Sequence, residues 1–196
     1  DAAIRIGIRH GWKPLGKPRT VTSSSGNIIK TIDDKPAISL YEEYFGKNNQ
    51  EIRSGELMHI SIRYPLGIYL EGEEEYLLRN ALWADNDGSL ICQGDVPNGA
   101  SIKLMMGTKE SALKAAASAA EAAKKTSQRD KPLKFALIFD SFSRNRLLGR
   151  NAPDEINIIK DILGKDIPFI GFYTYGEQAP LNALDYKGQS YFHNES

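Results

Sequence analysis

Five strand-like segments joined by turn dipeptides fill residues 57–107, and this run constrains the fold more than any other feature. Asp87-Gly88 and Asn98-Gly99 lie between the segments, and such dipeptides are typical of tight chain reversals. Strands that follow one another through short turns pair antiparallel. We therefore expect an antiparallel sheet in the middle of the chain. The predicted strands are His59–Tyr64, Leu66–Leu70, Leu77–Ala84, Ser89–Gln93 and Ser101–Met106.

Helical patterns follow this run. Eight of the twelve residues in 112–123 are alanine, the strongest helix former, and Thr108 is a suitable cap for that helix. A second helix is predicted over 151–164, and two short apolar segments, 135–139 and 169–173, are predicted to be buried strands. Because consecutive strands precede a mixture of helices and strands, the expected fold class is α+β: a mostly antiparallel sheet with helices packed against it.

The N-terminal quarter of the chain has weaker patterns. Alternating isoleucines predict a strand over residues 4–8. Two further apolar segments, 19–24 and 27–32, flank a Ser-Gly pair and predict a hairpin. An Asp and a Pro at the start of 34–46 suit the first turn of a helix, and a Gly suits its end. The polar stretch 47–56 is predicted to be a loop or a domain boundary.

Composition excludes several classes of protein. Lys and Arg number 25, as do Asp and Glu, and the resulting zero net charge argues against a nucleic-acid-binding protein. The one cysteine, Cys92, excludes an intramolecular disulfide and suits a reducing compartment, so we expect a cytoplasmic protein with a buried, unreactive thiol. No apolar stretch approaches the roughly 18–20 residues that a membrane helix needs, so no membrane segment is expected in this chain.

The two ends of the chain point to a fragment. Asp1 rather than Met begins the sequence and runs directly into a predicted strand. The sequence stops at Ser196, shortly after another strand-like segment. We therefore expect the chain to be an excised part of a longer protein.

Enzyme motifs do not occur in the sequence. It has no GxSxG nucleophile elbow, no Walker loop and no HExxH helix. The three histidines, His10, His59 and His193, are far apart and lack metal-ligand spacing to one another or to Cys92. We therefore expect a non-catalytic protein with no metal and no cofactor.

Polar residues follow both predicted C-terminal strands, and they form the candidate ligand-binding site. If strands 135–139 and 169–173 are neighbours that run in the same direction, Arg144 and Glu177 lie at the same rim. An amino acid needs a cation for its carboxylate and an anion for its ammonium, and this pair supplies both. The alternative is an Arg144–Glu177 salt bridge that pins two loops together. The candidate residues are Arg144, Tyr173, Tyr175, Glu177, His193 and Asn194.

Four motifs in order resemble the FIST sensory family. They are Gly171–Glu177 (GFYTYGE), Ala136–Arg144 (ALIFDSFSR), the terminal His193-Asn194, and His10–Gly16 followed by Val21-Thr22. The resemblance covers almost the whole chain but not the whole family unit. It predicts that residues 1–56 are the tail of the N-terminal FIST half and residues 57–196 the C-terminal FIST domain. Many family members carry a cysteine before the arginine, where this chain has Asp140-Ser141.

The resemblance implies a non-catalytic sensory domain of a signal-transduction protein. Such a domain binds a small ligand, with an amino acid the usual suggestion, and signals to an output protein or domain. Three alternatives remain open. An enzyme would require Glu177 or His193 to have a shifted pKa and a substrate within reach. A haem-based gas sensor would use His10, His59 or His193 as the axial ligand. A protein-recruitment scaffold would show an exposed apolar patch and no small-molecule pocket.

Overall fold

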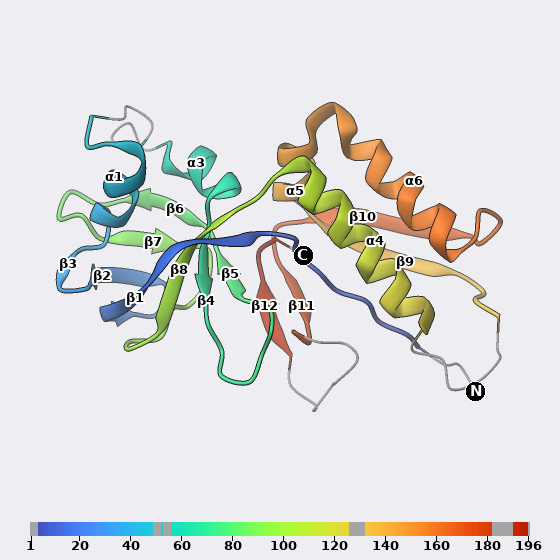
Figure 1. Ribbon diagram of the computed structural model, residues 1–196, viewed down its shortest axis with the longest axis horizontal. Coiled ribbons are helices and arrows are strands. Elements are labelled where there is room, and N and C mark those ends of the chain that lie inside the picture. The colour runs from blue at the N-terminus through green and yellow to red at the C-terminus, as the bar shows by residue number, and fades with distance from the viewer. Residues whose placement is uncertain (1–3, 49–51, 53–55, 126–131, 182–189, 196) are drawn as a thin grey trace. The chain divides into compact units, whose positions relative to one another are not determined.

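Two compact units make up the chain in a computed structural model (Figure 1). The β unit comprises residues 13–106, and the α/β unit comprises residues 1–12 with 107–196. A mostly antiparallel sheet accompanied by helices confirms the expected α+β class. The structure describes residues 4–48, 52, 56–125, 132–181 and 190–195.

The β unit is built on a curled eight-stranded sheet with the order β5-β4-β8-β1-β2-β7-β6, in which β3 pairs with β2. Each of these pairings is antiparallel. The strands are β1 Lys13–Ser25, β2 Ile28–Ile32, β3 Lys35–Pro36, β4 Leu66–Ile68, β5 Leu77–Arg79, β6 Ala81–Ala84, β7 Leu90–Cys92 and β8 Ser101–Met106. The helices are α1 Ser39–Phe45 and α3 Leu57–Arg63.

The long strand β1 organises this sheet. Its first half pairs with β8 and its second half with β2, so one strand joins both sides of the curl. Gly26, with φ +57°, makes the turn into β2, and the predicted hairpin is confirmed. The inward side chains of the sheet form an apolar core. Its most buried members include Val21, Ile29, Leu66, Leu90, Ile102 and Leu104.

The α/β unit contains two parallel strands connected through helices. Strands β9 and β10 pair in parallel, and α4 and α6 pack against each other (Figure 1). A separate antiparallel pair, β11 and β12, follows β10. The elements are α4 Lys109–Lys125, β9 Ala136–Ser141, α5 Phe142–Leu148, a 3-10 turn Gly149–Asn151, α6 Ala152–Leu163, β10 Phe169–Thr174, β11 Glu177–Ala179 and β12 Tyr191–His193.

The segment before β1 runs close along the alanine-rich helix α4. A Cβ atom added at Gly7 would lie 1.8 Å from the carbonyl oxygen of Ala119, and one at Gly11 would lie 2.6 Å from that of Ser111. Only glycine permits so close an approach of two backbones. The predicted strand over residues 4–8 is therefore wrong: these residues form no strand pair in the described structure, and Ile4 is 86% exposed.

Two further element predictions need correction. Residues 59–64 were expected to be a strand, but helix α3 covers Leu57–Arg63, because Leu57, Ile60 and Ser61 bury one helical face. The helix predicted over 34–46 begins only at Ser39, because Lys35–Pro36 pair with β2 instead. Its predicted end at Gly46 is confirmed.

The strands β9 and β10 exist as predicted, but they are not buried as predicted. Ala136, Ile138 and Phe169 line a shallow hollow together with Ile159 and Leu163 of α6. The alternate side chains of both strands point the other way and are more than half exposed. A strand has two faces, and helices cover only one of them here.

The remaining predictions fare differently. The helices over 112–123 and 151–164 are confirmed as parts of α4 and α6. Most of the predicted loop 47–56 lies outside the described residues. The division of the chain at residue 56 stays a prediction. No helix that the structure describes combines the length and the apolar character needed to cross a bilayer.

Candidate ligand-binding site

The carboxyl ends of β9 and β10 lie side by side. Tyr173 is paired with Asp140 and Thr174 with Ser141, so both parallel strands end at the same level. In open sheets with parallel strands, ligands bind outside the carboxyl ends of the strands. The conditional prediction that the two strands are parallel neighbours is therefore confirmed, and it directs attention to the polar groups at this end.

A group of buried polar side chains surrounds this end of the strands, and we call it the polar cluster. Each member is at most 7% exposed, although ionisable side chains are seldom buried so completely. β9 and α5 contribute Asp140 and Arg144, α6 contributes Glu155, and the β11–β12 pair with its following residues contributes the rest. The polar cluster consists of Asp140, Arg144, Glu155, Glu177, His193, Asn194 and Glu195.

Arg144 occupies a fixed position in the polar cluster. Its Nε donates to Glu155 Oε1 at 2.9 Å, and its Nη2 donates to the same oxygen and, at 2.8 Å, to the Ala112 carbonyl. Its Nη1 donates to the His10 carbonyl at 2.6 Å, and its Nε lies 3.2 Å from Asp140 Oδ1. The guanidinium therefore ties α4, α5, α6 and the N-terminal segment together.

This geometry departs from the expected role of Arg144. Within the described residues, Arg144 forms salt bridges with Glu155 and Asp140 but not with Glu177. The alternative of an Arg144–Glu177 salt bridge is therefore not observed. The same contacts occupy the guanidinium edges that would clamp a ligand carboxylate.

Asp140 is the carboxyl group whose ionisation the surroundings change most clearly. Burial, together with the neighbouring Glu155 and Glu177, raises its pKa to about 8, while Arg144 acts in the opposite direction. A carboxyl group in this environment keeps its proton at neutral pH. Its Oδ2 has no hydrogen-bond partner among the residues that the structure describes.

Two hydroxyl groups connect the strand ends to the rest of the polar cluster. The Thr174 hydroxyl lies 2.5 Å from Glu177 Oε1 and 3.1 Å from the Asp140 carbonyl oxygen. The Ser141 hydroxyl donates to the Asn194 carbonyl at 2.7 Å. Glu177 itself is paired with His193 across β11 and β12. These links bring Glu177, His193 and Asn194 to one place.

Asn194 is the most unusual member of the polar cluster. Its side chain belongs to a residue only 1% exposed, yet neither Oδ1 nor Nδ2 has a hydrogen-bond partner in the described part of the chain. Leaving a buried amide unbonded costs about 1–3 kcal/mol. A buried group with unused hydrogen-bonding capacity calls for an explanation, and a ligand supplies one.

The two predicted tyrosines lie apart from the buried groups. Tyr173 is 41% exposed and Tyr175 is 72% exposed, so both present surface to solvent. The Tyr175 ring lies 5.1 Å from the Phe142 ring at the start of α5. Both residues flank the carboxyl end of β10, where they can form an outer wall but not a buried contact.

The histidines show three different environments. The His10 Nδ1 accepts a hydrogen bond of 2.9 Å from the Trp12 backbone N–H, and the His193 Nε2 lies 3.1 Å from the Ala179 carbonyl oxygen. His59 lies on α3 in the β unit with an exposed side chain. Within the described part of the chain, no three His, Cys, Asp or Glu side chains are grouped to hold a metal ion.

Sequence reasoning missed Asp140, Glu155 and Glu195 as cluster members. Glu155 had a usable signal, because it lies four residues before Ile159 and eight before Leu163, on the apolar stripe of α6. A carboxylate on a buried stripe needs a buried partner, and Arg144 is that partner. Glu195 carries no such pattern, because it follows a short edge strand near the end of the chain.

Comparison with known proteins agrees with this architecture. The chain matches the FIST C domain over residues 37–180 and the FIST N domain over residues 1–35. Two curated relatives are uncharacterized proteins of Mycobacterium tuberculosis, from strains CDC 1551 / Oshkosh and ATCC 25618 / H37Rv. Each is 28% identical over 184 residues, which is 90% of this chain and 47% of the relative. The chain thus spans about half the length of the curated relatives it matches, and no solved structure matches it.

The FIST C domain match alone covers well over half of the chain, and it includes both parallel strands and the residues at their carboxyl ends. The chain therefore belongs to the FIST family, whose domains are sensory domains of signal-transduction proteins.

Proposed function

We propose that the chain senses a small amine-bearing ligand, an amino acid in the first instance, at the polar cluster. The observation that carries this proposal is the excess of buried acid. In the described part of the α/β unit, four carboxyl groups and one guanidinium are buried. Burying ionised carboxyl groups is costly, and an ammonium group bound beside them lowers that cost.

Protonation and ligand binding are alternative ways to offset this acid excess. In the absence of ligand, the raised pKa of Asp140 lets its carboxyl group keep a proton at neutral pH. An ammonium group beside Asp140 and Glu177 would favour the ionised carboxylates and displace that proton. Asn194 adds an amide oxygen and an amide N–H, which can bond an ammonium and a carboxylate respectively.

The carboxylate of an amino acid has no strong anchor at Arg144, because that guanidinium already bonds Glu155 and two backbone carbonyls. We therefore assign recognition chiefly to the ammonium end. Tyr173 and Tyr175, which are exposed at the same end of β10, provide the outer wall for a side chain.

A thermal-shift and calorimetric screen with matched ligand pairs tests this proposal. Each amino acid is compared with its N-acetyl derivative, which lacks the ammonium, and with its methyl ester, which lacks the carboxylate. At a hundredfold excess over Kd, a ligand stabilises by about 2.7 kcal/mol, or roughly 5–10 °C for a chain of this size. We expect the ester to keep most of the shift and the N-acetyl derivative to lose it.

Site variants locate the binding. Glu177→Gln should abolish the shift, whereas Glu121→Gln, an exposed carboxylate on α4 of the same unit, should leave it unchanged. Two outcomes would contradict the proposal. One is amino-acid binding that survives Glu177→Gln, and the other is the absence of any thermal shift with every amino acid and derivative tested.

A protein-recruitment function is the second candidate, and one observation favours it. The outward face of β9 and β10 exposes large apolar side chains, such as Phe139 and Phe172, of the kind that mark protein interfaces. Substitutions on that face should then abolish capture of a signalling partner while amino-acid binding persists.

A further inference from the structure

One face of the β9–β10 pair is an exposed apolar surface, and we call it the apolar face. Leu137 and Phe139 of β9 are 56% and 54% exposed, and Ile170 and Phe172 of β10 are 65% and 58% exposed. The register places Ile170 opposite Leu137 and Phe172 opposite Phe139. The two Phe rings meet edge to face with their centroids 5.2 Å apart. The four side chains therefore form one continuous patch.

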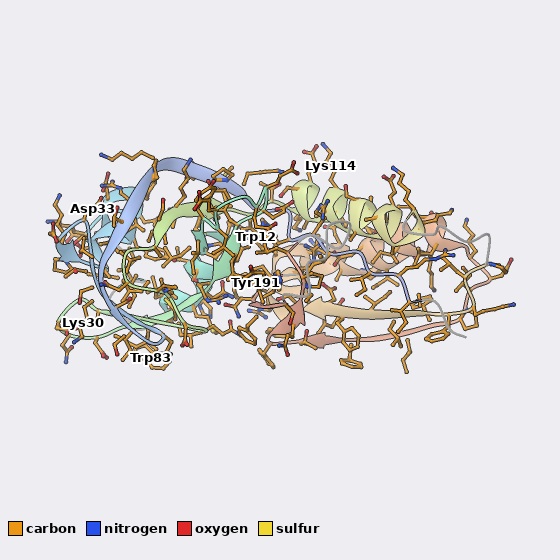
Figure 2. The ribbon with its side chains drawn as sticks, turned by 90° about the horizontal axis from the view of Figure 1, so that it is seen from below. Trp12, Lys30, Asp33, Trp83, Lys114 and Tyr191 are labelled. Carbon is orange, nitrogen blue, oxygen red and sulfur yellow. The ribbon has the colours of Figure 1, made fainter. Side chains whose placement is uncertain are left out.

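The opposite face of the same two strands is covered. Ala136, Ile138 and Phe169 meet Ile159 and Leu163 of α6 there. Figure 2 shows α4, with Lys114 labelled on its outer side, on one side of the strands and a row of side chains projecting from the other. The helices of the α/β unit therefore leave the apolar face bare.

A parallel sheet in this state is incomplete. Parallel strands occur almost only where both faces are covered, and their sequences accordingly read as continuous apolar runs. The runs Ala136–Phe139 and Phe169–Phe172 have that character, with no charged side chain in either. Two strands are also fewer than a stable sheet normally needs. The sequence of β9 and β10 thus suits a site in which further polypeptide covers the apolar face.

Two observations identify the polypeptide. The aligned region makes up only 47% of the M. tuberculosis relatives, so in those proteins it is joined to polypeptide of at least its own size. Furthermore, residues 4–12, which match the FIST N domain, already pack into the α/β unit along α4, with the His10 carbonyl bonded to Arg144. FIST N sequence is therefore integrated into the unit that carries the apolar face.

We propose that the apolar face is the docking surface for the remainder of a FIST N domain, which covers it with apolar side chains. The face carries no charge that would select a nucleic acid or a charged peptide. The proposal is independent of the ligand at the polar cluster.

The test compares Thr substitutions on the apolar face of this chain with Thr substitutions at the aligned positions of a longer relative. In the 196-residue chain, Leu137→Thr combined with Ile170→Thr should lower the melting temperature by less than about 3 °C, because both side chains are exposed and Thr favours strands. In the intact relative from M. tuberculosis H37Rv, Thr at the two aligned positions should lower it by more than about 8 °C, because burial there makes the loss costly.

The matched control is Trp83→Thr, an exposed aromatic of the β unit, which should have a similar effect in the chain and at the aligned position of the relative. A double variant of the relative that does not fold at all, while its control folds, also supports the proposal. A small and equal loss in both proteins would overturn it. A dimer of the chain would also overturn the proposal if light scattering shows that Leu137→Thr combined with Ile170→Thr dissociates it. A second copy of the chain would then be the occupant of the apolar face.

Discussion

Among the described residues, each unit of the chain buries one arginine, and the two have different kinds of partner. Arg79 of the β unit donates from Nε to the Asp95 carbonyl at 2.9 Å and from Nη1 to the Leu78 carbonyl at 2.8 Å. Arg144 of the α/β unit also reaches carbonyls, but in addition it bonds the Glu155 carboxylate and lies beside the Asp140 carboxyl group. Burial lowers the pKa of Arg79, which lies near a neutral thiol, Cys92.

This difference indicates that Arg79 has a structural role, whereas Arg144 belongs to a candidate functional site. The carbonyl groups of Asp95 and Leu78 bond Arg79 without introducing another ion, so backbone dipoles shield its charge. In the described part of the α/β unit four carboxyl groups are buried, and one of them, Asp140, holds a proton. Such perturbed groups gather at functional sites more often than elsewhere.

The largest expected effect is the loss of Arg144. Arg144→Met should lower the free energy of unfolding by about 3–5 kcal/mol, because it leaves Glu155 buried without its cation. Arg79→Met should cost about 1–3 kcal/mol, because it leaves the Asp95 and Leu78 carbonyls without this donor. Urea denaturation of both variants measures the difference.

Adding Glu155→Gln to Arg144→Met should restore part of that loss, because the carboxylate is then removed together with its partner. Two results would contradict the distinction between the two units. One is an equal loss of unfolding free energy in Arg144→Met and Arg79→Met, and the other is no recovery of stability when Glu155→Gln is added.

A pH titration of stability sharpens the comparison. The folded pKa of Asp140, about 8, lies above its value of 3.8 outside the folded chain. Its contribution to stability is therefore complete below about pH 4 and is lost as pH rises through about 8. Asp140→Asn cannot ionise, so the stability of this variant relative to the wild type should increase from pH 4 to pH 8, by a few kcal/mol.

Thermal unfolding of both proteins at several pH values checks this expectation. Asp33→Asn in the β unit is the matched control: the Thr20 N–H bond lowers the pKa of that carboxyl group below 3.8, so its difference from the wild type should stay constant from pH 4 to pH 8. A difference between wild type and Asp140→Asn that stays constant from pH 4 to pH 8 would show that Asp140 is ionised throughout.

The smallest effect concerns the thiol beside Arg79. Burial raises the pKa of Cys92 to about 12, and the residue is 0% exposed. We expect a thiol reagent at pH 8 to modify the folded protein no faster than the chain unfolds, because the reactive thiolate is scarce and covered. Rapid modification of the folded protein would mean that Arg79 activates the thiol. The buried arginine of the β unit would then belong to a reactive site, and the contrast with the α/β unit would fail.

Local sequence signals predicted most elements of this fold. The turn at Gly26, the alanine helix and the apolar runs of β9 and β10 depend on residues within a few positions of each other, so their patterns were readable. The failures at residues 4–8 and 59–64 have a different origin. Residues 4–8 pack along α4, and residues 59–64 pack against β6. In both cases packing against an element distant in sequence overrides the local preference for a strand.

The candidate site was predicted as a location but not as an arrangement. The sequence placed Arg144 and Glu177 after two strands, and the parallel register of β9 and β10 brings those strand ends together. It could not choose the partner of Arg144, since carboxylates occur throughout the chain. That choice depends on how α6 lies against β9, which presents Glu155 to the guanidinium.

The amino-acid order alone specified the secondary-structure types, the strand ends and the turn that carries Glu177, because these follow from side-chain periodicity and backbone preference. Tertiary packing decided which faces are covered, which carboxyl group keeps its proton and where Arg144 makes its bonds. The reason is physical: solvation and charge depend on neighbours in space. The bond from Arg144 to the His10 carbonyl, across 134 residues of sequence, exists only after the chain has folded.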